Sequence, residues 1–207
     1  MKKTLSILFA VILWLSVITQ FYLMMENKTA TVTETIIRFF SFFTILTNTL
    51  AAIYFTTQIF NYNRRVQAGT LTAITVYILI VGFVYQVMLR HIWEPTGLQM
   101  IVDELLHSIN PLLVILYWYL YEEKQSVKYK HIVKWLIFPF VYLIFIFMRG
   151  KISGFFPYPF INVNEIGFLT ALTNSSMLLI IFTLTSLLFI MLGKYISKKE
   201  SESVIMK

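Results

Sequence analysis

Long apolar runs, almost free of charged residues, alternate along this chain with short polar segments. A helix needs roughly 20 mostly apolar residues to cross about 30 Å of hydrocarbon at about 1.5 Å per residue. The runs therefore predict six transmembrane helices. Their expected ranges are 4–25, 36–60, 70–90, 101–121, 132–150 and 166–192. The fold class that follows is all-α, a polytopic membrane helix bundle in which residues 1–207 form a single domain.

Two of the runs fit a membrane span less directly. The fifth is free of charge only between Trp135 and Met148, so Lys134 and Arg149 must extend their long side chains to the two interfaces. The first follows two lysines, as the apolar part of a signal peptide does. Bulky residues at positions 21–25 replace the small residues that a cleavage site needs, and we expect a retained membrane anchor.

The composition excludes several classes of protein. The chain is 58% hydrophobic and only 13% charged, whereas soluble domains are roughly a quarter charged. A soluble globule is therefore excluded. The absence of Cys excludes a disulfide scaffold, an iron–sulfur cluster and a thiol nucleophile.

The net charge of +7 indicates how the helices are oriented. With the N-terminus inside, 12 of the 17 Lys and Arg residues fall in inner segments, namely Lys2, Lys3, Arg64, Arg65, Lys124, Lys128, Lys130, Lys134, Lys194, Lys198, Lys199 and Lys207. The outer side has five, namely Lys28, Arg38, Arg90, Arg149 and Lys151. Cytoplasmic loops are enriched in Lys and Arg, which predicts a cell-membrane protein with both termini cytoplasmic. We expect membrane lipids as partners, and no nucleic acid.

Polar side chains inside the predicted spans gather at one depth. Helical rise places Thr44 and Asn174 about 12 Å, and His107 about 9 Å, inward from the start of their spans. Gln86 lies near the outer end of the third span. Because polar groups are costly in hydrocarbon, this layer predicts a polar cavity that opens toward the outer leaflet. The alternative is that these residues only form hydrogen bonds between helices.

His107 is the candidate for chemistry within this layer. It is the one His of three inside a predicted span, and Asp103 and Glu104 precede it by about one turn. Such a His can act as general base for a hydroxyl nucleophile while a carboxylate orients its ring. The alternative is a buried structural His. Asn48 and Asn110 add polar groups on the same helices. No paired-His spacing predicts a metal site, and no phosphate-binding or α/β-hydrolase motif occurs.

Three segments together resemble a known family. They are Phe-Phe-Thr-Ile-Leu-Thr-Asn at 42–48, Glu-Leu-Leu-His at 104–107 with Pro111, and Tyr-Pro-Phe at 158–160. In order and spacing they are similar to the androgen-induced and androgen-dependent integral membrane protein family, most of all to its prokaryotic six-transmembrane branch. Animal members of that family are threonine hydrolases that cleave fatty acid esters of hydroxy fatty acids. The resemblance implies Thr44 and His107 as the catalytic pair. Asn162 departs from the family, where this position is often acidic.

The outer segment 151–165 is rich in Gly, Pro and aromatic residues. One interpretation is an aromatic loop at the membrane interface. The other is a lid that admits acyl chains to the cavity, with Tyr158 and Phe160 as substrate contacts. Arg149, at the base of this segment, either anchors its helix at the interface or holds a fatty-acid carboxylate.

The leading hypothesis is an intramembrane threonine hydrolase of lipid esters that needs no cofactor and no metal. Thr44 attacks the ester carbonyl, His107 transfers the proton, and Asn48, Asn110 or Asn174 donates to the oxyanion. The alternative is a non-enzymatic lipid-binding protein or small transporter that uses the same cavity. Transporters often have internal repeats, and none is evident in this sequence.

Overall fold

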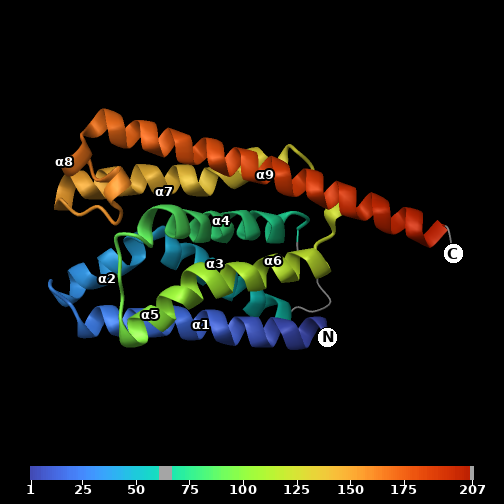
Figure 1. Cartoon of the computed structure of the whole chain (residues 1–207), viewed down its shortest axis with the longest axis horizontal. Helices are drawn as coiled ribbons and strands as arrows, with labels where there is room; N and C mark the ends of the chain where they lie inside the picture. The colour runs from blue at the N-terminus through green and yellow to red at the C-terminus, as the bar shows by residue number, and fades with distance from the viewer. Residues whose placement is uncertain (61–66, 206–207) are drawn as a thin grey trace. The chain divides into compact units, whose positions relative to one another are not determined.

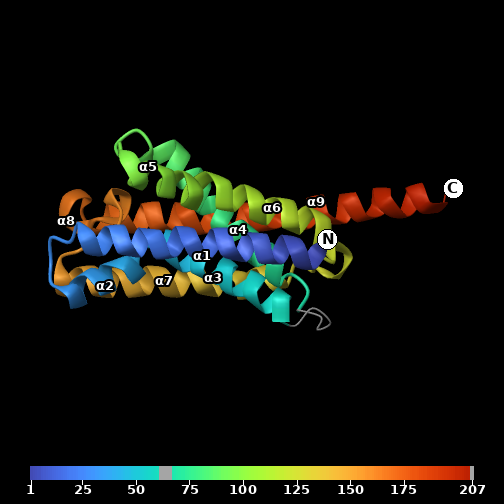
Figure 2. The same ribbon diagram turned by 90° about the horizontal axis from the view of Figure 1, so that it is seen from below.

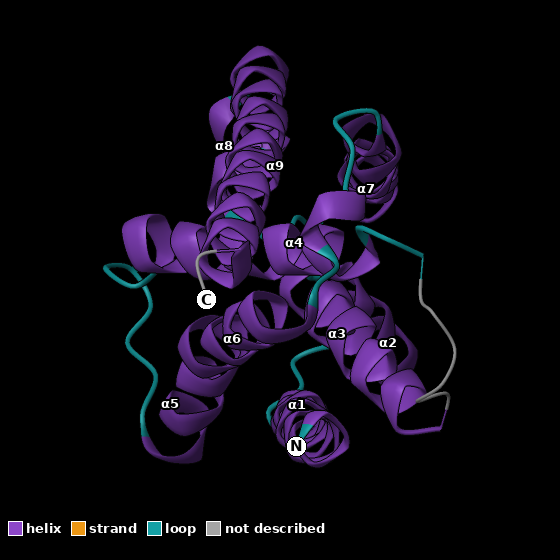
Figure 3. Cartoon of the chain, turned by 90° about the vertical axis from the view of Figure 1, so that its right-hand side faces the viewer, coloured by secondary structure: helices purple, strands orange, loops and turns teal. Residues whose placement is uncertain are grey.

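The structure is a computed structural model that describes residues 1–60 and 67–205. Three residues assigned above to the inner side, Arg64, Arg65 and Lys207, lie outside the described residues. The chain is 85% helical, and the described ranges contain no strand (Figure 3). The prediction of an all-helical fold is confirmed.

Contacts group the chain into two compact units. The first comprises Met1–Arg64 and Tyr77–Leu120, and the second comprises Arg65–Val76 and Tyr121–Lys207. The helical segments of the first unit are α1 (Lys2–Glu26), α2 (Val32–Ser41), α3 (Phe43–Phe60), the end of α4 (Thr70–Val84), η1 (Tyr85–Leu89), α5 (Gly97–Glu104), η2 (Leu105–Ile109) and α6 (Asn110–Tyr121). Within this unit, α1 packs against α2, α3, α5 and η2 (Figure 1).

The second predicted span is broken. A continuous helix was expected over 36–60, but α2 and α3 meet at an angle of 75°. The Ser41 hydroxyl donates to the Ile37 carbonyl at 2.7 Å, and Phe42 is extended with φ −81° and ψ 122°. Side-chain bonds of this kind compete with the main-chain ladder and bend helices. The break makes Phe43 the first residue of α3 and puts Thr44 in its first turn.

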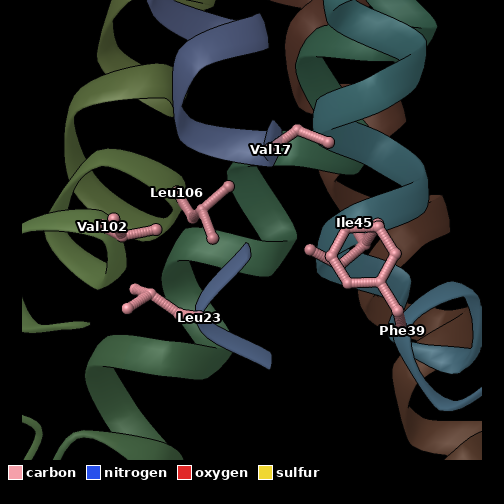
Figure 4. Packing of buried hydrophobic residues seen from close by; sticks show 6 residues of the cluster. All are labelled: Val17, Leu23, Phe39, Ile45, Val102 and Leu106. Atoms are coloured by element: carbon pink, nitrogen blue, oxygen red, sulfur yellow. The ribbon is translucent and has the colours of Figure 1, made fainter. Parts of the chain in front are cut away.

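Two groups of buried side chains hold the first unit together. One joins α1, α2, α3, α5 and η2 through six apolar residues, which are Val17, Leu23, Phe39, Ile45, Val102 and Leu106 (Figure 4). The other is aromatic: the Phe55 ring lies 5.6 Å from that of Phe9 and 4.8 Å from that of Tyr117, in edge-to-face geometry. The Tyr117 hydroxyl and Ser6 Oγ are 2.8 Å apart, so the polar end of this aromatic cluster is paired.

The second unit is built around two long helices. Its segments are the start of α4, η3 (Lys124–Ser126), α7 (His131–Ser153), η4 (Pro159–Ile161), α8 (Val163–Ile166) and α9 (Phe168–Ile205). Helix α9 packs against α7, α8, η3 and η4. With 38 residues it is about 57 Å long, and its C-terminal part continues past the start of α7 (Figure 2). The Glu122 carboxylate accepts bonds from the Thr72 N–H and hydroxyl at 2.8 Å and so caps the first turn of α4.

The helices are consistent with a multipass membrane protein. Among the described residues, five helical segments are long and apolar enough to cross a membrane, and the bent pair α2–α3 brings the number to as many as six. The segment predicted at 132–150 is a helix of 23 residues that includes Pro139. Hydropathy and length therefore located the helices, but they did not predict the break at Phe42, the π-helical turns η1 and η2, or the extension of α9 to Ile205.

Candidate functional site

Thr44 and His107 lie next to each other in the first unit. The hydroxyl of Thr44, in the first turn of α3, is 3.4 Å from Nε2 of His107, in η2. Thr44 is 7% exposed. These two residues were selected from the sequence by their depth and by the family resemblance, and the structure brings their polar atoms within hydrogen-bond distance.

The main chain of Asp103 determines which nitrogen of His107 holds the proton. His107 Nδ1 lies 2.9 Å from the Asp103 carbonyl oxygen. A carbonyl oxygen can only accept a hydrogen bond, so Nδ1 donates and Nε2 of the neutral ring is left as the acceptor. The Thr44 hydroxyl therefore donates to Nε2, which is the arrangement that a general base needs.

Tyr85 stacks on the His107 ring. Its ring is parallel to the His107 ring within 10°, with centroids 4.0 Å apart, and Tyr85 is 4% exposed. Both residues lie in π-helical turns, Tyr85 in η1 and His107 in η2. Such turns are rare and often occur at functional sites. The stack restricts rotation of the imidazole, so Tyr85 acts on the geometry of the site through His107.

Gly82 allows α4 to approach η2 closely enough for this stack. A Cβ at Gly82 would lie 2.7 Å from the His107 carbonyl oxygen and 3.3 Å from Pro111 Cγ. No real Cβ makes the first of these contacts, so only glycine fits. The sequence gives Gly82 no visible role, because its reason is the packing of two helices that are distant in the chain.

We therefore expect Gly82→Ala to destabilise the protein. The added methyl must displace the main chain at His107, and overpacking of this kind costs about 1–3 kcal/mol. The check is the free energy of unfolding of the purified protein, measured by denaturant titration in detergent. Gly82→Val should be worse than Gly82→Ala. Equal stability of the wild type and both variants would show that the close approach is not required.

The carboxylates of Asp103 and Glu104 form their hydrogen bonds with side chains other than His107. Asp103 Oδ2 accepts from Trp93 Nε1 at 2.5 Å and Oδ1 accepts from Gln99 Nε2 at 3.2 Å. Glu104 pairs with Arg90, with 2.6 Å between Oε1 and Nη2. The sequence led us to expect a carboxylate that orients the ring. In the structure a main-chain carbonyl does this instead, because the carboxylates of α5 have other partners.

Asn48 and Asn110 form a buried polar network between α1, α3 and α6. Both N–H groups of Asn48 are used, by the Thr44 carbonyl at 2.9 Å and the Leu106 carbonyl at 3.3 Å. Asn110 Nδ2 donates to Asn48 Oδ1 at 2.7 Å and to Ser16 Oγ at 2.8 Å. These amides hold the helices of Thr44 and His107 together. Donation to a substrate oxyanion would require breaking one of these bonds.

The remaining candidates belong to the second unit. Asn174 Nδ2 donates to the Phe160 carbonyl at 2.8 Å and fixes the segment after α7 to α9. The Tyr158 and Phe160 rings stack with centroids 5.2 Å apart. The Arg149 guanidinium lies 5.3 Å from the centroid of the Phe155 ring. This outer segment is thus ordered by its own contacts, and its role as a lid and the common depth of Asn174 and Thr44 stay predictions.

Comparisons with protein-family models, with curated proteins and with solved structures found no match to this chain. The class of protein is therefore defined by its own architecture, an all-helical chain with apolar helices consistent with a multipass membrane protein. Its candidate chemistry is defined by a hydroxyl and an imidazole between those helices.

Proposed function

We propose that this protein is an intramembrane hydrolase of lipid esters, with Thr44 as nucleophile and His107 as general base. The observation that supports this most directly is the chain of contacts from Thr44 Oγ through His107 Nε2 and Nδ1 to the Asp103 carbonyl. A nucleophile, a base and a group that orients the base are the three parts that hydroxyl-based acyl transfer requires. The distance of 3.4 Å between Oγ and Nε2 is long for a hydrogen bond, as is common in catalytic pairs without substrate.

The reaction proceeds in two steps. Thr44 Oγ attacks the ester carbonyl carbon, and its proton passes to His107 Nε2. The bond from the carbonyl carbon to the alcohol oxygen then breaks, and the alcohol leaves with that proton. Water, activated by the same nitrogen, attacks the acyl–Thr44 ester and releases the carboxylic acid. The balance is one ester and one water consumed for one acid and one alcohol.

The negative charge that develops on the carbonyl oxygen needs a partner. Among the Asn candidates of the first unit, Asn48 and Asn110 have N–H groups that already donate elsewhere. Thr44 lies in the first turn of α3, where the helix dipole has its positive end. Preorganised dipoles of this kind stabilise oxyanions in acyl transfer. We therefore assign the larger part of this stabilisation to the start of α3, which exists because the chain breaks at Phe42.

The membrane orientation, the family and the substrate class are part of the same proposal. The charge asymmetry supports a cell-membrane protein with both termini cytoplasmic, and in this orientation Thr44 and His107 would lie nearer the outer leaflet. The motifs at 42–48 and 104–107 support membership of the androgen-induced and androgen-dependent membrane protein family. Acyl esters that partition into the membrane, including fatty acid esters of hydroxy fatty acids, are the substrate class that fits.

An activity-based probe tests the proposal. A fluorophosphonate should label the purified protein at Thr44, because His107 increases the nucleophilicity of this hydroxyl. Labelling should be absent in His107→Gln and retained in Thr47→Ala, which removes a neighbouring hydroxyl of α3. The labelled residue is identified by peptide mass spectrometry. Absence of labelling in a folded wild-type protein would favour a non-enzymatic lipid-binding protein.

A further inference from the structure

A second polar feature of the first unit is lined by residues close to His107 in the chain, but its lining includes neither Thr44 nor His107. It is a groove of about 360 Å³ between the end of η1 and the helix formed by α5 and η2. The residues that line it are Arg90, Met100, Ile101, Glu104, Leu105 and Ile109. We call it the Arg90 groove. Its size is in the range of sites that take small ligands or part of a larger one.

An ion pair between Arg90 and Glu104 forms one end of the Arg90 groove, and each of its two residues has a further hydrogen-bond partner. Arg90 Nη2 lies 2.6 Å from Glu104 Oε1, and Arg90 Nη1 donates to Gln86 Oε1 at 2.7 Å. Gln86 Nε2 donates to Ser108 Oγ, and the Ser108 hydroxyl donates to Glu104 Oε2 at 2.7 Å. The four side chains form a closed ring between the C-terminal end of η1 and the junction of α5 and η2. The two charges are therefore fixed in position relative to each other.

This ion pair is exposed rather than buried. The side chains of Arg90 and Glu104 are 47% and 37% exposed. Two of the five N–H groups of the guanidinium are used by Gln86 and Glu104, and the others have no partner among the described residues. The pair can thus bind a further group that offers both an acceptor and a donor.

The remaining wall of the groove is apolar. Met100 and Ile101 are about half exposed, and Ile109 is 41% exposed. Beyond Ile109 the exposed apolar surface continues along α6 through Leu112 and Leu116. Trp93 follows Arg90 by three residues, is exposed, and donates to Asp103, the residue before Glu104. Trp is enriched at the level of lipid headgroups, which supports a headgroup depth for the ion pair and an apolar stripe directed toward the acyl chains.

We infer that the Arg90 groove binds one glycerophospholipid whose headgroup has both a phosphate and a primary ammonium. The phosphate contacts the Arg90 guanidinium and the ammonium donates to the Glu104 carboxylate, while an acyl chain follows Leu105 and Ile109. Because the pair has no net charge, an anionic headgroup gains from Arg90 but is repelled by Glu104. A zwitterionic headgroup pairs with both. This inference concerns binding and holds whether or not the lipid is cleaved at Thr44.

Native mass spectrometry of the purified full chain tests this inference. The probes are dioleoyl phosphatidylethanolamine and dioleoyl phosphatidylglycerol, added at equal concentration. We expect about tenfold preference for the ethanolamine lipid, the effect of one additional charge-assisted hydrogen bond. Thr44→Ala should show the same preference, so that failure of binding and failure of hydrolysis are observed separately. Equal retention of the two lipids by the wild type, or a preference for the glycerol lipid, would overturn the inference.

Variants of groove residues test whether the preference for the ethanolamine lipid arises in the Arg90 groove. Glu104→Gln should invert it, because Arg90 then attracts the anionic lipid without an opposing carboxylate. Ile101→Trp fills the groove at an exposed position, leaves the ion pair intact and should abolish retention of both lipids. Arg38→Gln is the matched control, since it breaks the Arg38–Glu34 pair of α2, which is not part of the groove. If Glu104→Gln and Ile101→Trp both bind as the wild type does, the lipid lies elsewhere.

Discussion

Replacing His107 with Ala is expected to lower ester hydrolysis by the purified protein by about 100- to 10,000-fold, the usual contribution of a general base. Thr44→Ala should remove the reaction through an acyl–enzyme altogether. Both losses should be in kcat with little change in KM, because the pair acts on the transition state rather than on ground-state binding. The measurement is steady-state cleavage of a fatty acid ester of a hydroxy fatty acid in mixed micelles.

Two variants of α3 control this experiment. Thr44→Ser keeps a hydroxyl at the same position and should retain part of the activity. Thr47→Ala removes another buried hydroxyl, which donates to the Thr44 carbonyl at 3.1 Å, and should leave most of the activity. Thermal melting in detergent identifies any variant that fails to fold. Wild-type rates in folded Thr44→Ala and His107→Ala would mean that the two residues are only structural.

The positions of the helices followed from hydropathy and length, but their interruptions did not. A membrane-spanning helix is recognised in a sequence by about 20 consecutive apolar residues. The ranges predicted in this way agree with α1, α7 and the start of α9. The break at Phe42 has no Pro or Gly to signal it. The π-helical turn at 85–89 also contains no Pro or Gly, whereas the turn at 105–109 lies just before Pro111, which has no N–H to donate to the His107 carbonyl. Both turns lie where Gly82 and Tyr85 pack against His107, and the pattern of a single helix cannot predict a contact between two helices.

In the candidate site, the sequence predicted the depth of the side chains but not the direction in which they point. Helical rise gave Thr44 and His107 similar depths, and the structure brings their polar atoms within 3.4 Å. Rise alone does not say which way a side chain faces. For this reason the sequence suggested a carboxylate partner for His107, whereas the partner is the Asp103 carbonyl. Sequence analysis also missed Tyr85. In an apolar span, the sequence pattern around an aromatic residue does not distinguish a ring stacked on a site residue from a ring in the hydrophobic core.

Replacing Tyr85 with Leu is expected to reduce hydrolysis by about 10- to 100-fold, since small displacements of a catalytic group are costly. Loss of the aromatic ring frees the imidazole to rotate away from Thr44 and leaves space in a buried position. Tyr85→Phe keeps the ring and should keep the activity. A purely structural role of Tyr85 would lower stability in Tyr85→Leu without changing kcat in the fraction that remains folded.

The tautomer of His107 shows directly whether Tyr85 orients the imidazole or has a purely structural role. The protein has three His residues, so nitrogen-15 labelling of His gives three imidazole signal sets, and His107→Gln identifies one by its absence. In the wild type we expect Nδ1 of His107 to be protonated and Nε2 to be unprotonated, since Nδ1 donates to the Asp103 carbonyl. Tyr85→Phe should preserve this pattern, and Tyr85→Leu should give a mixture of tautomers. A proton on Nε2 in the wild type would make donation from Thr44 impossible, and the Thr44–His107 mechanism would have to be abandoned.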